Sequence, residues 1–265
     1  MLRPRIIPCL LVRNKGLVKT VKFKDPKYVG DPINAVKIFN EKEVDELMVL
    51  DIDATVEGRE PDYRMIENLA VECRMPLCYG GGIKTAEQAQ RIFSLGVEKV
   101  AVSSAAVEEP ELVSRMAERV GNQSVVVVLD VHKKMLGGYE VFTRNGRRNS
   151  KKEPAEFAAE LERLGAGEIV INSIDQDGLM KGYDLALAER IRNAISVPMT
   201  VLGGAGSLED LERLFGSHGI VGAAAGSLFV FKGVYRAVLI NYPNRDEKFD
   251  LIRRGRERFD GKGNM

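Results

Sequence analysis

Five aspartates lie at or just beyond the ends of apolar runs of strand length, where a carboxyl group can do acid–base chemistry: Asp51, Asp53, Asp130, Asp175 and Asp177. Asp130 follows five consecutive apolar residues, so we expect it to leave a dry interior and enter an open mouth. Burial of that kind raises the pKa of a carboxyl group and suits it to proton transfer near neutral pH. The alternative is a carboxylate that only caps the next loop.

Two glycine clusters that follow apolar runs have the composition of anion sites: Gly80-Gly81-Gly82 and Gly203-Gly204-Ala205-Gly206. Without Cβ atoms, backbone amides can close on a phosphate, and the N-terminus of a following helix adds its positive end. Ser103-Ser104 and Gly226-Ser227, after the next apolar runs, add hydroxyls and amides. We therefore expect two phosphate sites and a substrate with phosphate at both ends. Plain tight turns between strand and helix are the alternative.

Four charged residues stand where apolar runs begin: Arg5, Glu46, Lys99 and Glu168. Two are basic and two are acidic, so side by side they would form a neutral, salt-bridged ring. If these runs are the strands of one barrel, the ring would close the end opposite the glycine clusters. Solvated strand starts are the alternative interpretation.

The elements that position these residues repeat at an offset of about 122 residues. Pro76, the glycine pair 81–82 and the segment 85–87 recur as Pro198, the pair 203–204 and the segment 207–209. Such a repeat, close to half the chain length, indicates a duplicated half-fold. In this register Leu11 occupies the place in the first half that Asp130 occupies in the second.

Eight apolar runs of strand length recur in both halves with long, medium and short gaps; they begin near Ile6, Glu46, Pro76, Lys99, Ser124, Glu168, Pro198 and Gly219. Several are apolar at every position, as in parallel strands covered on both faces. Helical patterns lie between them, at 154–164 and 185–195, and Asp31-Pro32 is a helix start. The chain therefore predicts a (β/α)₈ TIM barrel of two duplicated half-barrels over residues 1–242. A doubly wound open sheet is the alternative, and residues 243–265 are expected to form a charged C-terminal extension, as a helix or a frayed tail.

Composition narrows the classes of partner. The formal net charge of +1 gives no electrostatic case for nucleic acid or an acidic membrane surface, and no apolar run approaches the length of a membrane span. Three cysteines without metal-ligand spacing are expected to be reduced thiols of a cytoplasmic protein, and two histidines exclude a His-rich metal site. We expect neither a metal nor a cofactor.

From about residue 3 to 242 the chain resembles the HisF family, the cyclase subunit of imidazole glycerol phosphate synthase. The isomerase that precedes this enzyme in histidine synthesis fits less well. The motifs that carry the resemblance are Arg5-Ile6-Ile7-Pro8-Cys9-Leu10, Gly30-Asp31-Pro32, Asp45-Glu46-Leu47, Tyr79-Gly80-Gly81-Gly82-Ile83, Gly165-Ala166-Gly167-Glu168-Ile169, Asp175-Gln176-Asp177-Gly178, Gly182-Tyr183-Asp184 and Gly203-Gly204-Ala205-Gly206.

The resemblance implies a barrel that receives ammonia from a HisH-like glutaminase docked on the N-terminal face of the barrel. Ammonia passes a charged gate, which maps onto Arg5, Glu46, Lys99 and Glu168, and reaches a phosphorylated substrate at the mouth. The resemblance places Lys19 in a mobile loop after the first strand, and Asp177 at the mouth. Together with the glycine and serine positions, the substrate- and phosphate-binding residues are expected to be Lys19, Gly81, Gly82, Ser103, Ser104, Asp177, Gly203, Gly204, Gly206, Gly226 and Ser227.

The mouth departs from the family pattern at the centre of its chemistry. In the HisF family, two aspartates act there as general acid and general base. In this chain Asp130 matches one of them, and Leu11 replaces the other. Further departures in the mouth are Ser103 for asparagine, Asn172 for threonine, Gln176 for arginine, Leu179 for threonine and Leu202 for serine. Loss of one of two proton-transfer groups typically costs on the order of 10²–10⁴ in rate.

The altered mouth resembles that of HisF-like proteins that act with a HisH-like glutaminase and an ATP-dependent sugar amidotransferase in surface polysaccharide (O-antigen) biosynthesis. The sequence thus predicts a lyase- or cyclase-type subunit of a glutamine amidotransferase complex, conducting ammonia for amidination of a nucleotide sugar. One alternative is the cyclase of histidine biosynthesis, which makes imidazole glycerol phosphate and AICAR phosphate. The second is an inert scaffold that activates a glutaminase.

Overall fold

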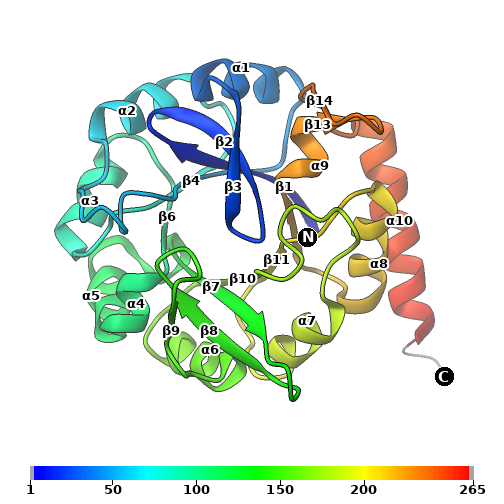
Figure 1. The fold of residues 1–265 in the computed structure, drawn as a ribbon. Helices are drawn as coiled ribbons and strands as arrows, with labels where there is room; N and C mark the ends of the chain where they lie inside the picture. Colours follow the sequence, from blue (N-terminus) through cyan, green and yellow to red (C-terminus); the bar gives the residue numbers. More distant parts are fainter. Residues whose placement is uncertain (1–2, 263–265) are drawn as a thin grey trace.

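The computed structural model describes residues 3–262, and within them eight parallel strands close into a barrel (Figure 1). The strands are β1 (Arg5–Arg13), β4 (Leu47–Asp51), β5 (Leu77–Gly80), β6 (Lys99–Val102), β7 (Val125–Lys133), β10 (Glu168–Ser173), β11 (Met199–Leu202) and β12 (Gly222–Ala225). Closure is direct, because β1 pairs in parallel with both β4 and β12. The predicted (β/α)₈ barrel is confirmed, and the open-sheet alternative is wrong.

Helices surround the barrel and explain why several of its strands have long apolar runs. They are α1 (Pro32–Glu41), α2 (Tyr63–Glu72), α3 (Ala86–Ser94), α5 (Glu111–Val120), α6 (Pro154–Arg163), α7 (Leu185–Arg192) and α8 (Leu208–His218), with the short α4 (Ser104–Glu108) and α9 (Ser227–Val230) and a 3₁₀ turn, Asn122–Ser124. One face of each strand packs on these helices, and the other faces the barrel interior. The interior cluster is small and apolar: Ile7, Cys9, Met48, Cys78, Ala101, Val126, Val128, Val170, Leu202 and Ala224.

The helix N-caps show the half-barrel repeat in atomic detail. Side chains 122 residues apart accept a backbone N–H from the first turn of equivalent helices: Asp31 and Glu153, Asp62 and Asp184, Thr85 and Ser207. Capping of this kind fixes where a helix begins. The two halves therefore share their helix starts as well as their strand order.

The first strand of each half is followed by a β-hairpin that sequence analysis missed. After β1 come β2 (Gly16–Val21) and β3 (Lys24–Gly30), and after β7 come β8 (Tyr139–Thr143) and β9 (Arg148–Asn149). Asn14 and Lys15 both have positive φ between β1 and β2, as a two-residue type I′ turn requires. Lys19, expected in a mobile loop after the first strand, instead lies in strand β2, and only 6% of it is exposed.

The helix expected after residue 242 is α10 (Arg245–Lys262), which lies beside α8 in the ring of helices (Figure 1). Arg254 and Arg258 both pair with Glu212 of α8. A two-stranded hairpin, β13 (Phe231–Lys232) and β14 (Ala237–Val238), precedes it. The domain boundary at residue 242 stays a prediction.

Tyr242 connects this C-terminal segment to the first strand. Its hydroxyl is buried, donates to the Ile6 carbonyl (3.0 Å) and accepts from the Asp45 N–H (3.3 Å). The hydrogen bond to Asp45 also restrains the loop that carries Glu46. Tyr242 therefore links the C-terminal segment to the end of the barrel that carries the charged ring.

We predict that Tyr242→Phe lowers the free energy of unfolding by about 1–2 kcal/mol, because two buried backbone groups lose their partner. Urea unfolding at neutral pH measures it. Tyr235→Phe is the matched control, since Tyr235 is 97% exposed. Equal losses in the two variants would contradict the structural role assigned to Tyr242.

Candidate functional site

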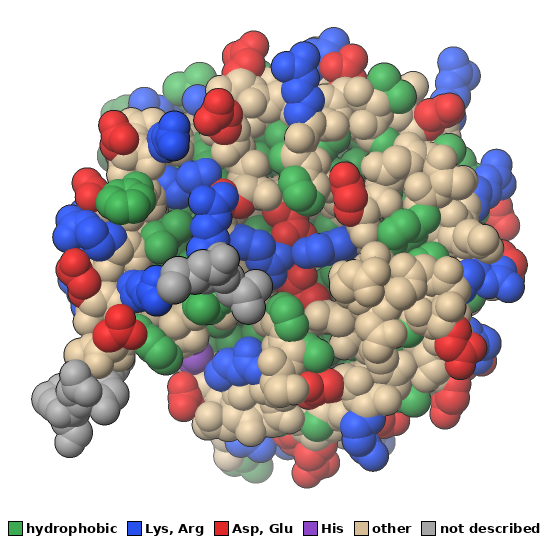
Figure 2. Space-filling view, turned by 180° about the vertical axis from the view of Figure 1, so that it is seen from behind, with side chains coloured by type: hydrophobic (Ala, Val, Ile, Leu, Met, Phe, Trp, Pro, Cys, Tyr) green, Lys and Arg blue, Asp and Glu red, His purple; other side chains and the backbone are tan. Residues whose placement is uncertain are grey.

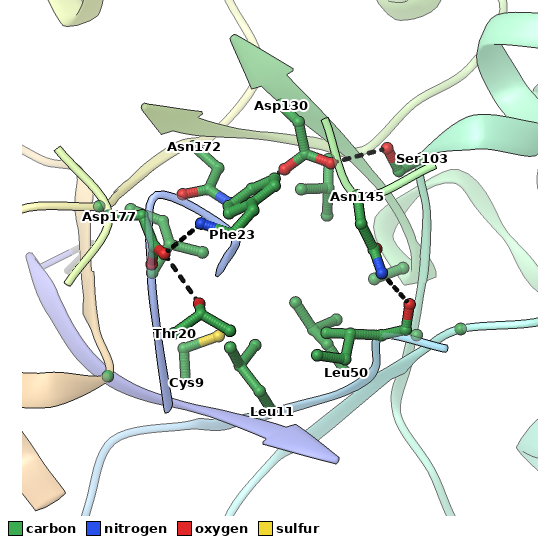
Figure 3. Close-up of a pocket in the computed structure, with 18 of the residues that line it drawn as sticks. Cys9, Leu11, Thr20, Phe23, Leu50, Ser103, Asp130, Asn145, Asn172 and Asp177 are labelled. Carbon is green, nitrogen blue, oxygen red and sulfur yellow. Dashed lines mark hydrogen bonds between the residues drawn. The ribbon is translucent and has the colours of Figure 1, made fainter. Parts of the chain in front are cut away.

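A cavity opens at the C-terminal ends of the strands and gathers nearly every residue predicted for the mouth (Figure 3). It is lined by Leu11, Lys19, Gly81, Gly82, Ser103, Ser104, Asp130, Asp177, Gly203, Gly204, Gly226 and Ser227, among others. Gly206 is not among the lining residues. Its N–H donates to Asp210, which caps α8. An anion at Gly206 would have to displace that carboxylate.

Asp130 lines the cavity, and its carboxyl group is hydrogen-bonded by residues on or just after the two neighbouring strands. It lies on β7 opposite Asn172 of β10, whose amide donates to it (2.9 Å), and the Ser103 hydroxyl lies 3.5 Å away. Burial raises the pKa of Asp130 to about 7, although the hydrogen bonds from Asn172 and Ser103 oppose the rise. The carboxyl group can therefore exchange a proton near neutral pH. The raised pKa expected from the sequence is confirmed.

Part of the wall across the opening from Asp130 is hydrocarbon. Leu11 and Leu50 lie on that side in Figure 3, and Leu202 adds to the lining. Leu11 packs against the apolar interior cluster together with Leu50. The position related to Asp130 by the half-barrel repeat thus has no group that can transfer a proton.

Lys19 is a buried cation in the cavity lining. It is contacted by Cys9, near it in the sequence, and by Gly226, near the other end of the chain. Its Nζ donates to the Cys9 carbonyl (2.5 Å), and a Cβ at Gly226 would overlap the ammonium group. Burial lowers the pKa of Lys19, while the Asp177 carboxylate opposes that change. The missing side chain at Gly226 is what admits the lysine.

The glycines of the two turns have structural reasons of their own. Gly81, Gly82, Gly203 and Gly204 all have positive φ, and a Cβ at Gly82 would lie 2.9 Å from the Arg59 carbonyl. The tight-turn interpretation therefore accounts for them without a ligand. The Gly82 N–H donates to the Thr55 hydroxyl (3.3 Å), so a phosphate there would have to replace that bond, and phosphate binding is carried forward as a proposal.

The tip of the β2–β3 hairpin lies over the cavity and adds residues that sequence analysis missed. Asp177 accepts from the Thr20 hydroxyl (2.8 Å) and the Phe23 N–H (3.1 Å), so the tip is tied to the loop after β10 (Figure 3). Asn145, from the loop between β8 and β9, donates to the Ile52 carbonyl (2.7 Å). The sequence signals were Asn14-Lys15-Gly16 and Asn145-Gly146, both typical of hairpin turns.

The other strand-top aspartates serve the loops. Asp51 lines the cavity, but one of its oxygens accepts the Asp53 and Ala54 N–H groups. Asp53 pairs with Arg13 (2.8 Å), and Asp175 pairs with His132. Asp130, by contrast, combines a position on the cavity wall with a pKa raised to about 7.

At the opposite end of the barrel, the four predicted residues form one ring. Arg5 bonds to both Glu46 and Glu168, and the Lys99 ammonium bridges the same two carboxylates at 2.9 Å each. Side chains of both signs gather at the centre of this face (Figure 2). The expected neutral, salt-bridged ring is confirmed, and the solvated alternative is wrong.

Electrostatics keep the ring ionised. Burial alone would raise the pKa of Glu168, but the Arg5 and Lys99 charges, with hydrogen bonds from Arg5 and Thr200, hold it well below its usual range. Burial likewise opposes the raised pKa values of Arg5 and Lys99, which the two glutamates bring about. Between the ring and the mouth, the barrel is filled by the apolar interior cluster.

Within residues 3–262, no helix is both long and apolar enough to cross a membrane. No three or more His, Cys, Asp or Glu side chains in that range are grouped so as to hold a metal ion. The three cysteines are free thiols.

These features define a class: a two-fold (β/α)₈ barrel with an ionic ring at one end and a glycine-framed cavity at the other. The family described as "Histidine biosynthesis protein" matches residues 5–236. Within that group the chain belongs to the HisF family, as its relatives show.

Relatives at two levels of similarity support this. A Vibrio vulnificus protein provisionally named imidazole glycerol phosphate synthase subunit hisF3 is 61% identical over 249 residues, 94% of this chain and 96% of that one. A Leptospira interrogans protein, provisionally named subunit HisF of the same synthase, is 60% identical over 253 residues, covering 95% and 100%. Imidazole glycerol phosphate synthase subunit HisF of Streptococcus sanguinis is 39% identical over 229 residues, covering 86% and 91%.

We predict that Asp130→Asn stabilises the fold increasingly as pH rises from about 4 to about 7, with a constant gain above that. A carboxyl whose folded-state pKa is raised contributes its stability below the unfolded pKa and loses it as pH rises through the folded value. Urea unfolding at pH 5 and pH 8 measures the difference. Asp25→Asn is the control, since Asp25 is exposed. A gain that is equal at both pH values would rule out the raised pKa.

Proposed function

We propose that this chain is a HisF-like synthase subunit that takes ammonia from a HisH-like glutaminase and delivers it through its barrel to an amidation other than imidazole glycerol phosphate formation. The observation that carries the proposal is the combination of a complete ionic ring with Leu11 opposite Asp130. A ring of four matched charges suits a gate for a small polar molecule. A cavity in which a leucine stands opposite Asp130 suits delivery of ammonia better than a cyclisation that needs a carboxyl group at both positions.

The acceptor we propose is a nucleotide sugar whose acetamido group becomes an acetamidino group during surface polysaccharide synthesis. An ATP-dependent sugar amidotransferase would activate that group, because displacement of an amide oxygen by ammonia needs an activated leaving group. The relatives near 60% identity carry provisional names, one of them numbered hisF3, which supports a paralogue. We expect the complex to act in the cytoplasm.

Phosphate binding is proposed at two places on the mouth: Gly81, Gly82, Ser103 and Ser104 on one side, and Gly203, Gly204, Gly226 and Ser227 on the other. Positive φ turns and the short helices that start at Ser104 and Ser227 support it. Lys19 and Asp177 lie beside the second place, and Gly206 would join it only if Asp210 released its N–H. Nucleotide sugars carry a diphosphate, which either place would suit.

The cyclase of histidine biosynthesis is the second candidate, favoured by the neutral-range pKa of Asp130 and by the family as a whole. The third candidate is an inert scaffold that activates a glutaminase. A scaffold conducts no ammonia, so this candidate gives no reason for a gate formed by Arg5, Glu46, Lys99 and Glu168.

We predict a stable complex with a HisH-like glutaminase on the face that holds the ring. Arg5 and Lys99 keep 25% and 19% of their side chains exposed there, so a docked partner reaches the ring directly. Co-expression followed by size-exclusion chromatography measures the complex. Glu98→Arg, on the same face, should reduce co-elution, and Tyr235→Arg, distant from the ring on the β13–β14 hairpin, should not. A barrel that elutes apart from every HisH-like glutaminase encoded with it defeats this proposal.

We predict very slow turnover of the phosphoribulosyl-formimino substrate by the wild-type protein with ammonium salts. Leu11→Asp should give a modest gain, because it restores a carboxyl group in the position equivalent to Asp130, while the isosteric Leu11→Asn should not. Adding Asp130→Asn to Leu11→Asp should remove the gain. Wild-type turnover of roughly 1–10³ s⁻¹ would instead establish the histidine-pathway cyclase.

A further inference from the structure

Thr200 meets the ring from β11 and was not among the residues predicted for it. It is fully buried, and its hydroxyl donates to Glu168 Oε1 (2.6 Å). The Thr200 hydroxyl oxygen also accepts from Arg5 Nη2 (3.5 Å). A hydroxyl that donates to a carboxylate makes a strong, charge-assisted hydrogen bond. Thr200 is therefore hydrogen-bonded to Glu168, an acidic member of the ring, and lies close to Arg5, a basic member.

The two carboxylates of the ring are held unequally as a result. Glu46 and Glu168 each bridge Arg5 and Lys99, but within residues 3–262 only Glu168 has the additional hydroxyl partner. The residue related to Thr200 by the 122-residue repeat is Cys78, whose thiol is buried in the interior cluster. The half-barrel symmetry is thus broken at the level of the ring.

Gly222 makes room for this hydroxyl. Thr200 pairs with Gly222 between β11 and β12, and a Cβ at Gly222 would overlap the Thr200 hydroxyl oxygen. Gly222 does not have a positive φ, so its backbone conformation is open to other residues. Space for the hydroxyl is a sufficient reason for this glycine.

We propose that Thr200 is a fifth member of the ring, a positioning residue that fixes Glu168 and keeps the ring closed at rest. The inference deepens the proposed function, since a gate needs a defined closed state, and it rests on that function for its role in transport. Without the hydroxyl, one oxygen of Glu168 loses a donor, and the carboxylate is free to follow Lys99 or Arg5 when either moves.

The native thiols provide a direct measure of ring opening. Cys78 is fully buried beside the ring, close enough for the charges of Glu46, Lys99 and Glu168 to act on it. Cys73 lies at the end of α2, partly exposed and outside the barrel. A small thiol reagent that enters through the ring would therefore modify Cys78 only when the ring opens, and Cys73 reports changes unrelated to the ring.

The test compares Thr200→Val, which keeps the shape but removes the hydroxyl, with Thr200→Ser, which keeps the hydroxyl. Modification by methyl methanethiosulfonate, followed by peptide mass spectrometry, gives the rate at each thiol in the isolated barrel. Thr200→Val should speed modification of Cys78 roughly tenfold, because the ring should open more often. Tenfold is the change in an equilibrium that corresponds to one pKa unit. Thr200→Ser should match the wild type, and Cys73 should react equally in all three proteins.

A second readout is the titration of Glu168, followed by carboxyl ¹³C NMR and assigned by its absence in Glu168→Gln. Thr200→Val should raise the pKa of Glu168 by about one unit, because the charged form loses a donor. Gly222→Ala displaces the Thr200 hydroxyl without touching the Glu168 carboxylate, and it should shift the pKa of Glu168 in the same direction. This second variant keeps the test decisive if Thr200→Val folds poorly.

Unchanged Cys78 modification together with an unchanged Glu168 titration in both variants would overturn the inference. Equal acceleration at Cys73 and Cys78 would also overturn it, because that result indicates general loosening. Neither readout needs a glutaminase. Failure to form the glutaminase complex would overturn the proposed function and the transport role of Thr200, and would leave its restraint on Glu168 to be decided by the thiol and NMR results.

Discussion

Closure of the parallel barrel, made by the pairing of β1 with both β4 and β12, is the constraint on which the rest of the structure depends. Because all eight strands run in one direction, closure brings their first residues together at one end and their last residues at the other. Arg5 and Glu168 are 163 positions apart in the chain, yet they share two hydrogen bonds at the end where strands begin. The same closure places Asp130 and Leu11 on opposite sides of a single cavity.

The two ends use charge in opposite ways. The ring balances two cations against two anions, and it stays ionised because each charge has partners of the other sign. Removing one partner from a buried ion pair typically costs about 3–5 kcal/mol, since the other charge is left unpaired. At the mouth, Asp130 accepts hydrogen bonds from an amide and a hydroxyl, and burial raises its pKa to about 7. Charges are therefore paired at one end of the barrel, whereas at the other end a buried carboxyl group has a raised pKa.

Four of the departures noted from the sequence, Leu11, Ser103, Asn172 and Leu202, line the cavity at the mouth. Leu11, Leu50 and Leu202 form hydrocarbon wall around the cavity that Asp130 faces. The hairpin β2–β3 covers the same cavity and is tied down by Asp177.

The sequence by itself determined the barrel, its two-fold repeat, the four charges of the ring and most of the cavity lining. These follow from local patterns: apolar runs at strand length, capping residues 122 positions apart, and charges or glycines at the ends of the runs. Tertiary structure alone decided the hairpins over the mouth, the burial of Lys19 beside Gly226, the diversion of Gly206 to Asp210, and the contact of Thr200 with Glu168. Each of these depends on which side chains from distant strands meet inside a closed barrel. A residue such as Thr200, ordinary within its own strand, acquires its partner only when β11 is placed between β10 and β12.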